Sequence, residues 1–222
     1  MTALDLSNFE LATTGLLVID MQNAFCDPEG TLATDGSNVG AIQSMMDPLR
    51  RVISTCQTAG IQDFWSLQEH YEDDATRSRH RLRPHTLKRP RVPSLKGTWD
   101  AEIVANLKDL IGDGSEVFTK NRFGCFYNTQ LEMLLRLHGI DTLIVTGVDT
   151  NVCVETTVRE AYMRDLDVIV LGDCVGGVHS GWARVALEVW ERYIGAVIAS
   201  DDLLQLIDDR QKGDADPVAH AG

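Results

Sequence analysis

The sequence predicts an α/β fold, with one doubly wound domain whose six-stranded, mostly parallel sheet carries helices on both faces. Three observations predict it. Short apolar runs alternate along the chain with stretches of helical periodicity. Several of these runs are hydrophobic throughout, which is typical of parallel strands buried on both faces. A chain of 222 residues without a repeat or linker has the length of a single domain. We expect that domain to span residues 1–210, followed by a polar, frayed tail at 211–222.

The individual elements follow from the apolar runs and from the glycines and capping residues that end them. The strands are expected at residues 15–19, 61–67, 115–119, 142–146, 168–171 and 196–199. Helices are expected at 39–59, in a short segment ending at 108, and at 128–138, 153–164, 181–193 and 201–208. The connection between the second strand and residue 96 is long, and such connections are often lids or interface loops.

Composition excludes some classes of partner. The net charge of −13 disfavours nucleic acid. There is no run of about 18 apolar residues, so we expect no membrane partner, and the N-terminus lacks the pattern of a secretory signal. The five cysteines are odd in number and form no C-x-x-C pair. They are expected to be free thiols in a reducing, cytoplasmic compartment.

Basic residues are concentrated in one segment. Residues 77–96 hold eight of the 20 Lys and Arg residues and no acidic residue. Such a segment can dock against the acidic body of its own chain or of a second subunit, or it can act as a lid facing an anionic substrate. A solvated loop is an equally simple interpretation.

Three chemically active side chains directly follow three of the predicted strands. Asp20, Lys120 and Cys153 each stand where an apolar run ends. In an open parallel sheet the carboxyl ends of neighbouring strands form one crevice, so these side chains are expected to converge there. The start of a helix at Cys153 would lower its pKa, Lys120 would stabilise its thiolate, and Asp20 would accept its proton. The alternatives are a capping role for Asp20 and a small buried hydrophobe for Cys153.

The segments around these residues resemble the isochorismatase-like cysteine hydrolases. The resemblance rests on four segments in the family order, at residues 17–25, 96–99, 120–123 and 145–154. It implies a three-layer α/β/α fold and a catalytic triad of Asp20, Lys120 and Cys153. It also implies a cis peptide between Val148 and Asp149, which would aim the N–H groups of Asp149 and Cys153 at the oxyanion of the reaction. Many relatives carry a small or hydroxylated residue at position 149, so the aspartate departs from the pattern.

The residues also indicate a branch of that family. True isochorismatases cleave a vinyl ether and lack the nucleophilic cysteine, so Cys153 favours the amide-hydrolysing branch. Nicotinamidases add a metal site of one aspartate and several histidines, but Gln68 occupies the aspartate position here, followed by His70, His80 and His85. Because glutamine is a poor metal ligand, we expect no metal and no cofactor.

The remaining resemblance is to the metal-free N-carbamoylsarcosine, ureidoacrylate and biuret amidohydrolases. It implies a small amide or ureido substrate, a thioester intermediate, release of ammonia, and a homo-oligomer, either a dimer or a tetramer. The residues expected to contact substrate are Phe25, Trp65, Gln68 and Phe126, with an arginine of 77–91 holding a substrate carboxylate. The aromatic residues would otherwise be ordinary core. A nicotinamidase-type metal amidase and a non-catalytic or redox thiol protein stay open as alternatives.

Overall fold

A single parallel sheet organises the molecule. The computed structural model describes residue 6 and residues 9–77 and 87–215. Its sheet has six strands in the order β3-β2-β1-β4-β5-β6, and every pairing is parallel. The strands are β1 Thr14–Ile19, β2 Gln62–Gln68, β3 Glu116–Lys120, β4 Thr142–Val148, β5 Asp167–Gly176 and β6 Ala196–Ile198. The predicted fold class is therefore confirmed.

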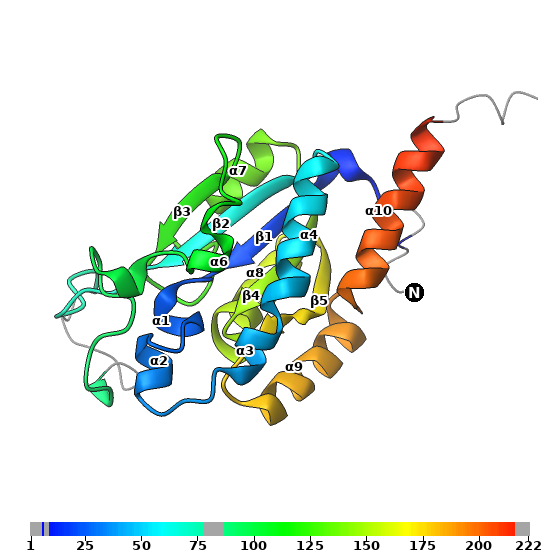
Figure 1. Ribbon diagram of the computed structural model, residues 1–222. Helices are drawn as coiled ribbons and strands as arrows, with labels where there is room; N and C mark the ends of the chain where they lie inside the picture. The colour runs from blue at the N-terminus through cyan, green and yellow to red at the C-terminus, as the bar shows by residue number, and fades with distance from the viewer. Residues whose placement is uncertain (1–5, 7–8, 78–86, 216–222) are drawn as a thin grey trace, which may run out of the picture.

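Helices cover both faces of the sheet and complete three layers (Figure 1). One face carries α3 Gly40–Ser44, α4 Met46–Thr58, α6 Ala105–Lys108 and α10 Ser200–Ala215. The other carries α7 Leu131–Leu137, α8 Glu155–Tyr162 and α9 Ser180–Tyr193. Shorter turns lie at η2 Leu11–Thr13, α1 Asn23–Cys26, α2 Thr31–Thr34, η3 Trp99–Ala101 and η4 Thr150–Val154, the last a π-helical turn.

The central strand explains why the sequence runs are hydrophobic throughout. Every residue of β1 is buried. Leu16 and Val18 pack into the core beneath α4 and α10, whereas Leu17 and Ile19 pack into the core beneath α7, α8 and α9. Because successive side chains of a strand point to opposite faces, a strand between two helical layers needs apolar residues at every position.

Two helices differ from the prediction. The helix expected at 39–59 is interrupted at Met45, between α3 and α4. Pro48 explains the interruption, because it cannot donate a hydrogen bond to the carbonyl of Ser44 and its ring crowds that position. The last helix continues to Ala215 rather than ending at 208, so the tail predicted at 211–222 is helical up to that residue. Residues 216–222 lie outside the described residues. Within the described ranges, no helix is both long enough and apolar enough to cross a bilayer.

Candidate active site

The carboxyl ends of four adjacent strands carry the site. Asp20 follows β1, Lys120 is the last residue of β3, and Cys153 lies in η4 just after β4. Of the three strands that precede or carry these residues, β1 and β4 are neighbours, but β2 lies between β1 and β3. Adjacent strands are about 4.8 Å apart, so the long side chain of Lys120 has to reach across the end of β2.

The three predicted side chains do converge. The Nζ of Lys120 lies 2.7 Å from Oδ2 of Asp20 and 3.3 Å from Sγ of Cys153. The other carboxylate oxygen, Oδ1 of Asp20, accepts a hydrogen bond of 2.7 Å from Ser66. Asp20, Lys120 and Cys153 are 1%, 2% and 7% exposed. An ammonium thus stands between a carboxylate and a sulfur in a site that excludes most water.

The backbone is specialised where β1 ends. Asp20 has a φ of +52°, in the left-handed region that non-glycine residues seldom adopt. Its N–H donates to the carbonyl of Ser66 at 3.1 Å, which ties this turn to β2. Such a conformation costs on the order of 1–3 kcal/mol and persists only where surrounding structure enforces it. Here it accompanies a carboxylate that points to Lys120.

Gly147 is required beside this turn. Its φ is +108°, and a Cβ at this position would lie 2.1 Å from the carbonyl oxygen of Ile19. Only glycine therefore lets β4 approach β1 so closely at their carboxyl ends. The pairing of β4 with β5 is also irregular between Val145 and Gly147. Beyond it, the Val148–Asp149 peptide bond is cis, at the position that the resemblance implies.

The electrostatic state of Cys153 differs from the expectation. Burial raises the pKa of its thiol well above the ordinary value, and the Lys120 ammonium opposes this only in part. The prediction of a lowered pKa was wrong because desolvation of a buried sulfur outweighs the field of one helix start and one ammonium. Burial also lowers the pKa of Lys120, but the opposing contributions, of which the charge of Asp20 is the largest, outweigh it and leave the pKa above its ordinary value. These directions favour a thiol at Cys153 and an ammonium at Lys120.

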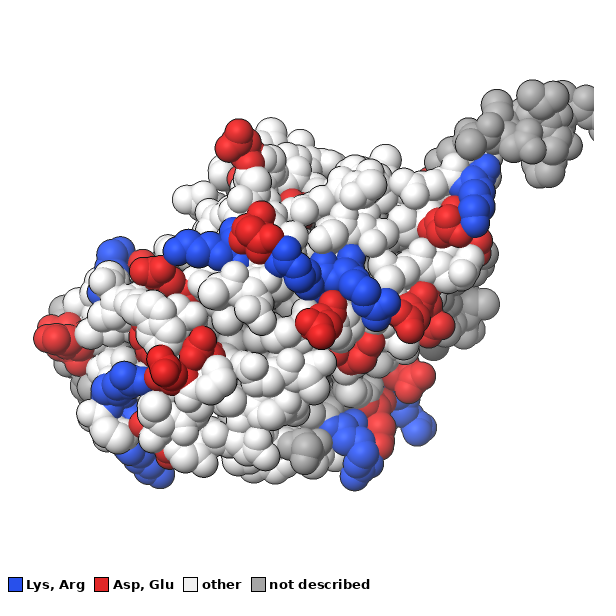
Figure 2. Space-filling model, viewed as in Figure 1, with Lys and Arg blue, Asp and Glu red and all other residues white. Residues whose placement is uncertain are grey.

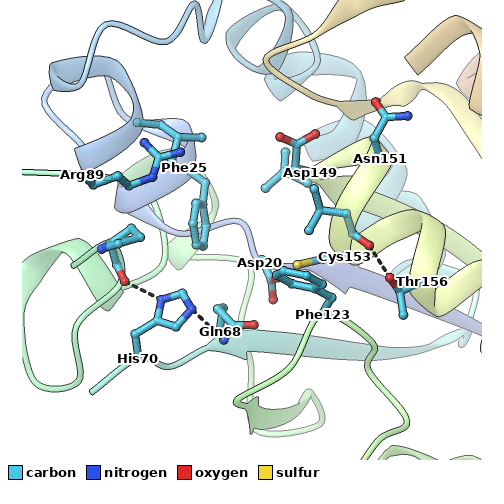
Figure 3. Close-up of a pocket in the computed structure, with 14 residues that line it drawn as sticks. Asp20, Phe25, Gln68, His70, Arg89, Phe123, Asp149, Asn151, Cys153 and Thr156 are labelled. Atoms are coloured by element: carbon cyan, nitrogen blue, oxygen red, sulfur yellow. Dashed lines mark hydrogen bonds between the residues drawn. The ribbon is translucent and has the colours of Figure 1, made fainter. Parts of the chain in front are cut away.

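A cavity of about 530 Å³ opens beside the sulfur. Figure 3 shows Cys153 and Asp20 between Gln68 and His70 on one side and Asp149 and Asn151 on the other. Much of the wall is apolar, and this part is formed by Phe25, Leu32, Pro93, Phe123, Val148 and Val152. The remaining wall residues are Asp20, Gln68, His70, Arg89, Asp149, Asn151, Cys153 and Thr156. The cavity is large enough for a small organic molecule.

A chain of hydrogen bonds holds Lys120 from the side of β2. The ammonium donates to Oε1 of Gln68 at 2.8 Å, and Nε2 of Gln68 lies 3.3 Å from Nε2 of His70. Nδ1 of His70 is 2.7 Å from the carbonyl oxygen of Pro93, so Nδ1 carries the proton and Nε2 is the acceptor. Burial lowers the pKa of His70, which favours this neutral form. The Gln68 amide is therefore oriented by protein partners at both ends.

Two of the four residues expected to contact substrate lie elsewhere. Phe25 and Gln68 line the cavity, but Trp65 and Phe126 do not. Trp65 is in the core and donates its indole N–H to Asp63 at 2.5 Å, and Phe126 is buried under the guanidinium of Arg164. The alternation along β2 could have excluded Trp65, because Ser66 and Gln68 belong to the opposite face.

Other wall residues were missed as substrate contacts. Phe123 comes from a loop, where no periodic pattern marks which side chains face inward. Arg89 also comes from a loop and is one of the arginines of 77–91 that were expected near the substrate. His70 was considered only as a metal ligand. Asp149 was given a role through its backbone N–H, and its carboxylate was noted as a departure from the family pattern. Among the described residues, no cluster of three His, Cys, Asp or Glu side chains could hold a metal. His80 and His85 lie outside the part of the chain that the structure describes.

The described part of the basic segment docks against the acidic body of its own chain. Arg77 pairs with Asp74, Arg89 with Asp35 at 2.8 Å, and Lys96 with Glu69 at 3.1 Å. Asp100, buried at the base of this loop, accepts hydrogen bonds from the N–H groups of Ser94 and Thr31. On the face shown in Figure 2, basic side chains lie beside acidic ones rather than in a separate patch. Residues 78–86 of the segment lie outside the description.

The fold and this cavity place the chain in the class of three-layer α/β proteins whose site lies at the carboxyl ends of the strands. Comparison with known proteins narrows the class. The model of the isochorismatase domain matches residues 14–202. Ureidoacrylate amidohydrolase RutB of Methylorubrum extorquens is 36% identical over 180 residues, which cover 74% of this chain and 70% of that protein. The chain belongs to the isochorismatase family.

Solved structures agree with that assignment. N-carbamoylsarcosine amidase from Thermoplasma acidophilum superposes with a TM-score of 0.68 and 26% identity, covering 85% of this chain and 97% of that one. A cysteine hydrolase from Pseudomonas syringae has a TM-score of 0.78 at 24% identity and covers 90% of this chain and 95% of that one. At that identity the second likeness supports the fold alone.

Proposed function

We propose that this protein is a cysteine-dependent amidohydrolase that cleaves the C–N bond of a small carbamoyl, ureido or linear amide compound. The single observation that carries the proposal is the Lys120 ammonium between the Asp20 carboxylate and the Cys153 sulfur, beside a cavity. Relatives named for ureidoacrylate and N-carbamoylsarcosine hydrolysis support an amide or ureido substrate.

The first step uses Asp20 as a general base. When substrate fills the cavity, the thiol proton of Cys153 passes to Asp20, and the sulfur attacks the carbonyl carbon. This transfer moves the negative charge from the carboxylate to the sulfur. Because Lys120 lies 2.7 Å from one and 3.3 Å from the other, its positive charge is paired before and after the transfer. Although the pKa of Cys153 is raised, the thiolate therefore needs to form only when the sulfur attacks the substrate.

Acyl transfer then follows. The N–H groups of Asp149 and Cys153 would stabilise the oxyanion of the tetrahedral intermediate. Asp20 returns its proton to the leaving nitrogen, the C–N bond breaks, ammonia departs and a thioester remains on Cys153. A water molecule gives its proton to Asp20 and attacks the thioester carbonyl. The proton goes back to sulfur, and an acid or carbamate is released.

An ammonia-release screen tests the proposal. Candidate substrates are ureido acids, biuret, nicotinamide and maleamate, each incubated with the wild type and with Cys153→Ala. We expect release of ammonia from at least one ureido or linear amide compound by the wild type and none by the variant. Ammonia release that Cys153→Ala retains would contradict the proposed nucleophile. Activity on nicotinamide alone that a chelator abolishes would support the metal-dependent alternative. The homo-oligomer and the cytoplasmic location stay predictions.

A further inference from the structure

The carboxylate of Asp149 stands at a fixed place on the cavity wall. Asp149 follows β4 directly and is half-buried. Figure 3 shows its carboxylate on the opposite side of Cys153 from Gln68 and His70. Its Oδ1 lies so close to Gly177 that a Cβ there would be 2.3 Å away. The side chain is thus packed against backbone rather than free to turn into solvent.

Among the charged wall residues, Asp149 is the one for which the described part of the chain shows no ion pair. Asp20 is paired with Lys120 at 2.7 Å, and Arg89 is paired with Asp35 at 2.8 Å. None of the ion pairs formed within the described ranges includes Asp149. The described residues of the wall thus include one carboxyl group without an ion-pair partner, at a place where a ligand would lie.

Two basic side chains, His179 and Arg89, act on Asp149 through their charge, but neither forms an ion pair with it among the described residues. Burial raises the pKa of Asp149, and the backbone N–H groups of Asn151 and Val178 oppose this, followed by the charges of His179 and Arg89. Burial lowers the pKa of His70, across the cavity, which favours its neutral form. A positive group brought by a ligand would favour the ionised carboxylate and would be favoured by it in turn.

The wall between the sulfur and this carboxylate is apolar. Val148 and Val152 flank Asp149 and Cys153, and Phe25, Leu32 and Phe123 form other parts of the wall. A ligand that reaches from the sulfur to the carboxylate therefore needs a hydrocarbon stem. We infer that Asp149 is a specificity-determining residue, which selects substrates whose reactive carbamoyl or amide group is joined by an apolar stem to an ammonium or guanidinium group. This inference rests on the proposed function for the reactive end of the substrate.

Charged thiol reagents test the inference without requiring turnover. Aminoethyl, methyl and sulfonatoethyl methanethiosulfonate share one reactive group and differ in the charge of their tail. Each transfers its alkylthio group to the Cys153 sulfur and releases methanesulfinate, and peptide mass spectrometry gives the rate at this cysteine. We expect the wild type to react faster with the cationic than with the anionic reagent. Asp149→Asn should reduce that ratio about 10-fold or more, the factor expected for one charge-assisted hydrogen bond.

A matched variant controls for net charge. Asp113→Asn removes one carboxylate from the exposed turn before β3, at the opposite end of the strands. It should leave the cation-to-anion ratio unchanged. An equal change of the ratio in both variants would overturn the inference, as would a wild type that reacts fastest with the anionic reagent.

Substrate ratios then separate this inference from the proposed function. The substrates are 4-aminobutylurea, n-pentylurea and 5-ureidopentanoate, which share the ureido group and carry a cationic, neutral and anionic end. A general loss of activity in Asp149→Asn affects all three, so only the ratios of kcat/KM report on side-chain charge. We expect the wild type to prefer 4-aminobutylurea and Asp149→Asn to lose that preference. If no urea is hydrolysed but the reagent ratio changes as stated, the proposed function fails while the cation preference stands. If the ureas are hydrolysed but the wild type prefers 5-ureidopentanoate, the proposed function stands and the inference about Asp149 fails.

Discussion

The hydroxyl of Ser66 donates a 2.7 Å hydrogen bond to Oδ1 of Asp20, which leaves Oδ2 for the ammonium of Lys120. β2 thus contributes a residue that orients the general base, although it supplies no member of the proposed triad. The same strand supplies Gln68, two residues further on, which accepts a hydrogen bond from Lys120 at 2.8 Å. Two polar side chains on one face of β2 therefore hold two members of the proposed triad: Ser66 holds Asp20, and Gln68 holds Lys120.

Replacing Ser66 with alanine should weaken the general base. Removing this donor leaves the Asp20 carboxylate less firmly oriented toward Lys120 and Cys153, so transfer of the thiol proton should slow. We expect kcat to fall about 10-fold, as for loss of one hydrogen bond to a charged group. Ser44→Ala, in an exposed turn of α3, is the matched control. An unchanged kcat in Ser66→Ala would show that this hydrogen bond does not orient Asp20 for the reaction.

Replacing Lys120 with methionine should abolish activity and destabilise the fold. The substitution leaves the Asp20 carboxylate buried without its counter-ion, which costs about 3–5 kcal/mol. Adding Asp20→Asn should restore much of the free energy of unfolding, measured with urea, because the buried charge is then removed. Activity should stay absent in the double variant. If the double variant is no more stable than Lys120→Met alone, the two side chains do not act as a buried ion pair.

Buried thiols should make the protein sensitive to alkali. Burial raises the pKa of Cys56 to about 12, of Cys125 to about 11 and of Cys174 to about 12, from an ordinary 9.0. The unfolded chain loses these protons at lower pH than the folded chain, so stability is fully present below pH 9.0 and declines above it. Each thiol contributes about 1.4 kcal/mol of loss for each pH unit in that range. Urea unfolding from pH 8 to pH 10 checks this, and Cys56→Ala should reduce the slope. Equal slopes for wild type and variant would contradict it.

The hydrogen bond between His70 and Gln68 should matter for the rate. His70→Leu removes one of the two acceptors of Nε2 of Gln68 and leaves the carbonyl oxygen of Glu69 at 3.3 Å, so the amide that accepts from Lys120 is held less firmly. We expect kcat to fall about 10-fold with KM for a neutral substrate changed less, since the affected group is Lys120. His70→Gln retains an acceptor and should recover part of the rate. A fall in kcat that is equal for both variants would assign His70 a packing role instead.

The sequence revealed the site where strand ends and polar residues coincide. Asp20 could be placed because it directly follows the apolar strand β1, and Lys120 because it ends β3. Cys153 could be placed because it lies in the segment that follows β4. The strand order could not be predicted, and with it the position of β2 between β1 and β3. For that reason the roles of Ser66 and Gln68 as supports of the triad were not foreseen.

Burial and loop conformation are the other features of the site that could not be predicted from the sequence. The pKa of Cys153 depends on how completely the sulfur is removed from water, which a sequence pattern does not report. Phe123 and Arg89 reach the cavity through loops whose path depends on tertiary contacts such as the pairing of Arg89 with Asp35. Trp65 and Phe126 were assigned to the cavity because they are aromatic and near the motifs. Strand parity places Trp65 in the core, and the packing of its loop places Phe126 there.

The proposed thioester on Cys153 is the central claim, and mass spectrometry of the acid-quenched protein during turnover tests it most directly. We expect an acyl increment on the peptide that contains Cys153, present only with substrate and absent from Cys153→Ala. Turnover by both the wild type and Cys153→Ala, with no increment on the Cys153 peptide of the wild type, would contradict the claim. An increment that maps to Cys26, Cys125 or Cys174 would also contradict it.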